Sequence, residues 1–139
     1  MHKKTKGSIA ELAVASRLMK DGWRIALPYG ENTRYDLVAE RDGRFVRIQV
    51  KYVTPKNGKL HVQSRSSNNW SVLAYTAKQI DAIAAYNPVD DSVYFIPVKD
   101  IGRTATNLRL DPPKNNQKAK VRYARDYGVL RERLARYLI

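Results

Sequence analysis

Four polar side chains form the part of this sequence that is best suited to chemistry. Gln49 and Lys51 alternate with apolar residues in one predicted strand, Asp36 lies in the strand before it, and Glu11 lies in a predicted helix. Two carboxylates, an amide and a lysine are the groups that metal-dependent hydrolysis of a phosphodiester requires. The prediction depends on whether the chain brings these four side chains together.

The dipeptide Asp42-Gly43 predicts a two-residue hairpin turn between a strand from Arg34 to Glu40 and a strand from Arg44 to Val53. In that register Arg41 pairs with Arg44, and counting back places Asp36 directly opposite Gln49. Directly opposed residues project from the same face, with their Cβ atoms roughly 5 Å apart.

Lys51 follows Gln49 by two positions and therefore shares its face of the strand. The intervening residues Val46, Ile48 and Val50 belong to the other face, which we expect to enter the core. A change of register by one residue would separate Asp36 from this polar face.

The helix that carries Glu11 is predicted to begin at Gly7-Ser8 and to end near Asp21. At about 100° per residue, one arc of this helix contains Glu11 as its single charged residue. The other members of that arc are Leu12, Ala15, Leu18 and Met19. A carboxylate that faces the core needs a cation or a metal as partner.

Two carboxylates and an amide oxygen from Glu11, Asp36 and Gln49 suit Mg²⁺, for which Mn²⁺ can substitute. When bound, such a metal lowers the pKa of water and polarises a phosphate. Lys51 could orient the attacking water or stabilise charge on the phosphate.

The rest of the chain predicts a mixed sheet flanked by helices. Loops are expected around Pro28, at Arg65 to Trp70 and at Asp111 to Lys120. The further elements are strands from Trp23 to Leu27, from Leu60 to Ser64 and from Ser92 to Val98, and helices from Thr76 to Tyr86 and from Val129 to Ile139. We expect one domain over residues 1–139, with a core at about 7–100 and a basic C-terminal extension at about 101–139.

The composition points to a polyanionic partner. The 139 residues include 26 Lys and Arg against 13 Asp and Glu, a net charge of +13. Nucleic acid is the commonest partner for such a charge; a membrane surface is the alternative, but no apolar stretch is long enough to span a bilayer. The absence of cysteine excludes disulfides and suits a cytoplasmic location.

Two polar segments are candidates for DNA contact, although a solvated surface is the ordinary explanation of such segments. The predicted loop with Arg65, Asn68 and Asn69 has the side chains that read guanine and adenine edges. The basic C-terminal segment would contact phosphates. Its members are Lys114, Lys118, Lys120, Arg122 and Arg125. His61 is interpreted as an ordinary strand residue.

Glu11, Tyr35-Asp36 and Gln49-x-Lys51 resemble the motif of the PD-(D/E)xK nuclease superfamily. The segments Gly7 to Ala13, Tyr35 to Leu37 and Ile48 to Lys51 more narrowly resemble the group I intron homing endonucleases built on that fold. The resemblance covers residues 7–53 and, more loosely, extends toward residue 98. It implies a restriction-endonuclease-like αβββαβ core, divalent-metal cleavage of double-stranded DNA, and a homo-oligomer, a dimer or a tetramer, that reaches both strands.

The sequence departs from the superfamily motif at two positions. Tyr35 replaces a proline whose role is backbone placement, and Gln49 replaces the usual acid, as it does in the homing branch. Two alternatives remain open, namely a Holliday junction resolvase and a non-catalytic DNA-binding module on the same fold.

Overall fold

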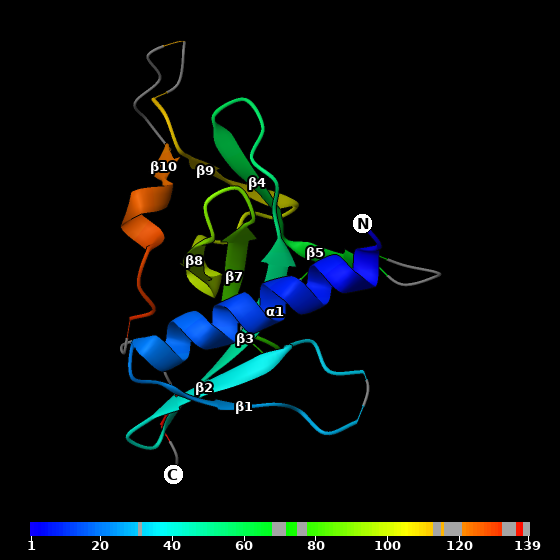
Figure 1. Ribbon diagram of the computed structural model, residues 1–139, viewed down its shortest axis with the longest axis vertical. Helices are drawn as coiled ribbons and strands as arrows, with labels where there is room; N and C mark the ends of the chain where they lie inside the picture. The colour runs from blue at the N-terminus through cyan, green and yellow to red at the C-terminus, as the bar shows by residue number, and fades with distance from the viewer. Residues whose placement is uncertain are drawn as a thin grey trace.

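The computed structural model describes residues 1–30, 32–67, 72–74, 78–112, 115, 121–131 and 136–137. Its main sheet has the strand order β1-β2-β3-β7-β8, and β11 pairs with the free half of β3. A helix, α1, crosses one face of this sheet (Figure 1). The strands are β1 (Arg24–Ala26), β2 (Leu37–Arg41), β3 (Arg44–Tyr52), β7 (Ala82–Asn87), β8 (Ser92–Pro97) and β11 (Arg136–Tyr137).

The helix α1 spans Lys3–Lys20, so it begins before the predicted start at Gly7. Nδ1 of His2 accepts a hydrogen bond from the N–H of Lys4 at 3.1 Å and caps the first turn. Gly7 is thus an interior helical residue. The predicted start at Gly7-Ser8 is therefore wrong, because the capping residue is His2.

The buried stripe of α1 is rotated from the predicted one. Ala10, Val14 and Leu18 are fully buried, whereas Leu12 is 72% and Met19 is 64% exposed. Glu11 is half-buried and lies at the edge of the packed stripe. The predicted arc was wrong at Leu12 and Met19 because the sequence does not show which side of the helix meets the sheet.

The β2–β3 hairpin has the predicted register. Arg41 pairs with Arg44 and Leu37 pairs with Ile48. Asp42 and Gly43 have φ values of 54° and 76°, the left-handed conformation that this tight turn requires. Every second residue of β3, from Val46 to Val50, is buried, which confirms the predicted core face.

The predicted helix from Thr76 to Tyr86 is wrong for the described residues. Ala82 to Asn87 form β7, which lies between β3 and β8 and is parallel to β3. All six residues of β7 are buried, and a buried central strand has a continuous apolar run that periodicity cannot distinguish from a buried helix. Thr76, the predicted helix cap, lies outside the described residues.

Two hydrophobic cores cover the two faces of the main sheet. The first lies under α1 and includes Ala82, Ala84 and Tyr86. The second includes the alternate β7 residues Ile83 and Ala85. Alternate residues of β7 therefore pack into the two different cores.

A second sheet contributes to the second core. Its order is β10-β9-β4, and its strands are β4 (Lys59–Gln63), β9 (Ala105–Arg109) and β10 (Arg122–Tyr123). Leu60, Val62 and Leu108 are its fully buried residues. The strand β4 was predicted as Leu60 to Ser64, whereas β9 was not predicted.

A short hairpin occupies part of the predicted loop after β4. Its strands are β5 (Arg65–Ser67) and β6 (Val72–Ala74), which are antiparallel. The loop prediction is therefore wrong for residues 65–67, because pairing with a later segment overrides the polar composition. Asn68 and Asn69 lie outside the described residues.

The C-terminal segment does not form the predicted final helix where it is described. Two short 3₁₀ helices, η1 (Val98–Asp100) and η2 (Ala124–Tyr127), precede an irregular stretch with the buried residue Leu130. Arg136–Tyr137 then pair with Phe45 and Arg44 as β11. Leucine spacing predicted a helix, but the free half of β3 offers backbone partners instead. Of the residues that the structure describes, only Lys3–Lys20 form an α-helix, so the second helix of the expected αβββαβ core is absent from them.

Candidate active site

The hairpin register places Asp36 across from Gln49. Leu37 pairs with Ile48, and the N–H of Asp36 donates to the carbonyl of Ile48 at 2.8 Å. Asp36 is thus the residue immediately before β2, at the point where the ladder with β3 ends. The sequence-predicted pairing of Asp36 and Gln49 is the continuation of this register.

The carboxylate of Asp36 continues the hydrogen bonding to β3 beyond the end of β2. Oδ2 of Asp36 accepts a hydrogen bond from the N–H of Val50 at 2.8 Å. That N–H would otherwise need a backbone partner from a longer β2. The bond fixes the carboxylate beyond the end of β2, where α1 can reach it.

Glu11 of α1 meets Asp36, and their side chains share a hydrogen bond. Burial, and then the Asp36 charge, raise the pKa of Glu11. Burial also raises the pKa of Asp36, although the Val50 N–H, the Glu11 hydrogen bond and the Lys51 charge oppose that shift. The shared bond raises the pKa of Glu11 and lowers that of Asp36.

Lys51 completes a cluster with the two acids. Its Nζ donates to the carbonyl of Arg65 at 3.3 Å. Burial lowers the pKa of Lys51, the charge of Asp36 raises it, and the charge of Lys3 lowers it. An ammonium that is partly removed from water beside a carboxylate pair is a feature of active sites.

Gln49 is placed by the register of β3 with its neighbours. It pairs with Ile83 of β7 and is half-buried, and it shares its strand face with Lys51. Asp36 thus interacts with both Glu11 and Lys51, and Gln49 lies across the hairpin from Asp36.

Sequence reasoning missed Lys3, whose charge acts on Lys51. The lysine-rich start of the chain was the signal that could have indicated Lys3. The predicted helix, which begins at Gly7, did not include it. Among the described residues, no three or more His, Asp or Glu side chains gather in a group that could hold a metal ion.

The residues predicted to contact DNA have different surroundings. Nε of Arg65 donates to the carbonyl of Arg103 at 3.3 Å, and the guanidinium of Arg125 lies 4.4 Å from the ring centroid of Tyr123. Arg122 lies 3.6 Å from Asp100. Lys114, Lys118 and Lys120 lie outside the described residues.

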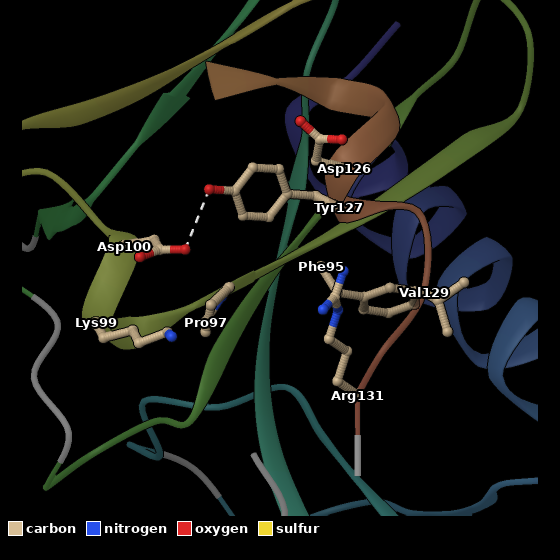
Figure 2. A pocket seen from close by; sticks show the side chains of 8 residues that line it. All are labelled: Phe95, Pro97, Lys99, Asp100, Asp126, Tyr127, Val129 and Arg131. Carbon is tan, nitrogen blue, oxygen red and sulfur yellow. Dashed lines mark hydrogen bonds between the residues drawn. The ribbon is translucent and has the colours of Figure 1, made fainter. Parts of the chain in front are cut away.

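A pocket of about 190 Å³ lies at the C-terminal segment, and none of the four candidate site residues lines it (Figure 2). The hydroxyl of Tyr127 donates to Asp100 at 3.1 Å across this pocket and accepts from Arg122 at 2.8 Å. The Tyr127 hydroxyl and the Asp100 carboxylate of this pocket are thus bonded to each other. No helix in the described part of the chain combines the length and apolar character that crossing a membrane requires.

A restriction-endonuclease-like sheet with a carboxylate pair and a lysine at the end of its hairpin defines a class of nucleases. The sequence matches the PD-(D/E)XK endonuclease family over residues 1–130, and the chain belongs to that family. It is an endonuclease.

Among solved structures, the fold is similar to the bacterial homing endonuclease I-Ssp6803I. The two chains are 27% identical with a TM-score of 0.71, and the match covers 91% of this chain and 88% of the other. A Holliday junction resolvase from Archaeoglobus fulgidus is less similar, with 20% identity, a TM-score of 0.47, and coverage of 73% of this chain and 80% of the other. No curated protein matches the sequence.

Proposed function

We propose that this endonuclease cleaves both strands of a specific double-stranded DNA site, with Mg²⁺ as cofactor, as a homo-oligomer of the homing type. The observation that carries the proposal is the cluster at the end of the hairpin, where the side chains of Glu11 and Asp36 are hydrogen-bonded to each other and the charge of Lys51 acts on Asp36.

The carboxyl pair fits a divalent cation. Two half-buried carboxylates repel each other, and the Asp36 charge contributes to the raised pKa of Glu11. A divalent cation would neutralise both charges. Glu11, Asp36 and Gln49 would hold it, and their all-oxygen donors suit Mg²⁺ or Mn²⁺. When bound, it would supply Lewis-acid activation of the phosphate and of water.

Lys51 acts on the scissile phosphate. The carbonyl of Arg65 and the charge of Asp36 hold its Nζ in place. The ammonium can donate to the attacking water or to a phosphate oxygen, where charge increases during the reaction. Partial burial strengthens this interaction, because less water competes for the ammonium.

Homo-oligomerisation follows from the number of sites. The chain carries one Glu11–Asp36–Lys51 cluster, and cleavage of two antiparallel strands by one kind of site needs two copies. A symmetric oligomer would also extend the surface that reads the DNA, as a long target site requires.

The test is a cleavage assay with supercoiled plasmid libraries, linear duplexes and a four-way junction, with Mg²⁺ or Mn²⁺ and with EDTA. We expect cation-dependent double-strand cleavage at defined sites, and loss of cleavage in Asp36→Asn. Cleavage of the junction alone would instead establish a resolvase. Equal cleavage by wild type and Asp36→Asn would remove the proposed site. Light scattering would give the oligomer mass.

A further inference from the structure

The strands β4 and β9 form an antiparallel ribbon with one buried face and one polar face. Leu60, Val62 and Leu108 face the second core and are fully buried. The alternate residues of both strands face outward. These outward residues are Lys59, His61 and Gln63 on β4, and Ala105, Asn107 and Arg109 on β9.

The outward residues pair across the two strands, and their charge differs from one end of the ribbon to the other. Lys59 pairs with Arg109, His61 pairs with Asn107, and Gln63 pairs with Ala105. His61, Gln63 and Asn107 are exposed. The ribbon thus has two cationic side chains at one end and neutral hydrogen-bonding groups along the rest of its length.

The central pair of the ribbon, His61 and Asn107, joins two hydrogen-bonding side chains. Nδ1 of His61 lies 2.8 Å from Oδ1 of Asn107. Because an amide oxygen can only accept, Nδ1 of His61 donates in this contact. The amide nitrogen of Asn107 keeps its two donors, and Gln63 offers a donor and an acceptor on one amide.

The ribbon leads directly into the catalytic cluster. Ser64 follows β4, and its N–H donates to the carbonyl of Thr104 just before β9 at 2.9 Å. The next residue, Arg65, accepts the Lys51 hydrogen bond and donates to the carbonyl of Arg103. The neutral end of the ribbon is thus next to Lys51, and the cationic end is farthest from it.

We propose that the outward face of the β4–β9 ribbon enters the major groove of duplex DNA, with His61, Asn107 and Gln63 reading base edges and Lys59 and Arg109 contacting phosphates. This inference rests on the proposed function and names the surface that selects the site. Apart from the cationic end, where Arg122 and Tyr123 of β10 pair with Leu108 and Arg109, the β4–β9 face is two-stranded. A two-stranded β-ribbon fits the major groove, where each base pair shows a distinct set of donors and acceptors.

Three observations favour duplex DNA as the occupant. The chain carries a net charge of +13, the cationic pair sits at one end of the ribbon, and the groups between that pair and Lys51 are those that read bases. At about 3.4 Å per residue, the stretch from Lys59 to Gln63 spans roughly four base pairs.

The experiment is selection of bound duplexes from a random-sequence library, with Ca²⁺ as the only divalent cation so that binding is measured apart from cleavage. The proteins are wild type, the double variant His61→Ala/Asn107→Ala, the single variant Gln63→Ala, and Arg24→Ala on the distant strand β1 as control. Asn107→Asp keeps the side-chain shape but removes the donors. Thermal melting verifies that each variant is folded.

We expect wild type to enrich a defined sequence. The ribbon variants should lose preference by about ten-fold or more at a contiguous block of roughly four base pairs, while the remaining positions stay enriched. Arg24→Ala should select the wild-type sequence.

Enrichment of the same sequence by the ribbon variants and wild type would overturn the inference, as would a wild type that enriches no sequence. The proposed function fails differently: the enriched duplexes would be bound but not cut when Mg²⁺ replaces Ca²⁺. In that case the ribbon would still be the reading surface.

Discussion

The polar face of β3 and the outward face of the β4–β9 ribbon look alike in sequence but differ in the structure. Both alternate polar and apolar residues. Lys51 and Asp36 are half-buried and have shifted pKa values, whereas His61, Gln63 and Asn107 are exposed.

This difference in burial separates chemistry from recognition. Partial burial makes a charge costly and therefore responsive to a metal or a phosphate. Exposed donors and acceptors remain hydrated in the free protein, where they are available to contact a partner. We expect substitutions on the two faces to change different measurements, and the following predictions test that separation.

The largest effect is expected for Lys51→Ala. The cleavage rate at saturating DNA should fall by about 10²- to 10³-fold, because charge on the phosphate loses its nearby ammonium. Affinity for the duplex in Ca²⁺ should change little. Single-turnover cleavage and fluorescence anisotropy measure the two quantities.

The matched control for that prediction is Lys20→Ala, which removes an exposed lysine at the far end of α1. Its cleavage rate should equal that of wild type. A Lys51→Ala protein that cuts at the wild-type rate would show that the hairpin face is ordinary polar surface.

The substitution Asp81→Ala should affect the polar face of β3 and the β4–β9 ribbon together. It acts on the stability of the whole fold, because it weakens the packing of β7 on β3. Asp81 is buried and accepts hydrogen bonds from the backbone N–H of Arg47 at 2.8 Å and from its Nε at 3.1 Å. Asp81→Ala should lower the free energy of unfolding by about 2–4 kcal/mol, measured by urea denaturation.

Asp21→Ala serves as the comparison for Asp81→Ala. Asp21, the residue that follows α1, forms a partly exposed ion pair with Arg17, and such pairs contribute about 0.5 kcal/mol or less. Equal losses in the two variants would contradict the structural role of Asp81.

The hairpin was predictable from sequence because its signals are local. Asp42-Gly43 selects the turn, the turn fixes the register, and alternation assigns the faces, so Asp36, Gln49 and Lys51 follow by counting. Glu11 was placed near them by helical periodicity, although the exact stripe needed the structure.

The second half of the chain was less predictable because its partners are distant. The apolar run of β7 fits a helix or a strand, and only its position between β3 and β8 decides. Similarly, β9 forms against β4 across more than forty residues, so neither its sequence nor the exposed position of His61 indicated a paired surface.

A smaller effect is expected for Glu11→Gln, which removes a charge from the acid pair. Because the folded protein raises the pKa of both Glu11 and Asp36, it binds protons more tightly than the unfolded chain. The pair therefore destabilises the metal-free protein at neutral pH, and this cost disappears as the pH falls through the raised pKa values.

Glu11→Gln should accordingly stabilise the metal-free protein at pH 7.5 by a few tenths of a kcal/mol to about 1 kcal/mol, since partial exposure screens the repulsion. The gain should vanish near pH 4. Urea denaturation in EDTA measures both values. Glu40→Gln on β2 corrects for the change in net charge, and an equal gain in that control would contradict the coupling of Glu11 to Asp36.

The smallest effect is expected at the cationic end of the ribbon. Lys59→Ala should weaken binding to every duplex by a similar factor and reduce the slope of log affinity against log salt concentration by about 1, because one phosphate contact is lost. Arg24→Ala removes the same charge from an exposed position on β1 and should leave the slope unchanged. Anisotropy titrations between 50 and about 200 mM salt give both slopes. An equal change in the two variants would show that binding depends on the net charge of the protein and not on the position of Lys59 in the ribbon.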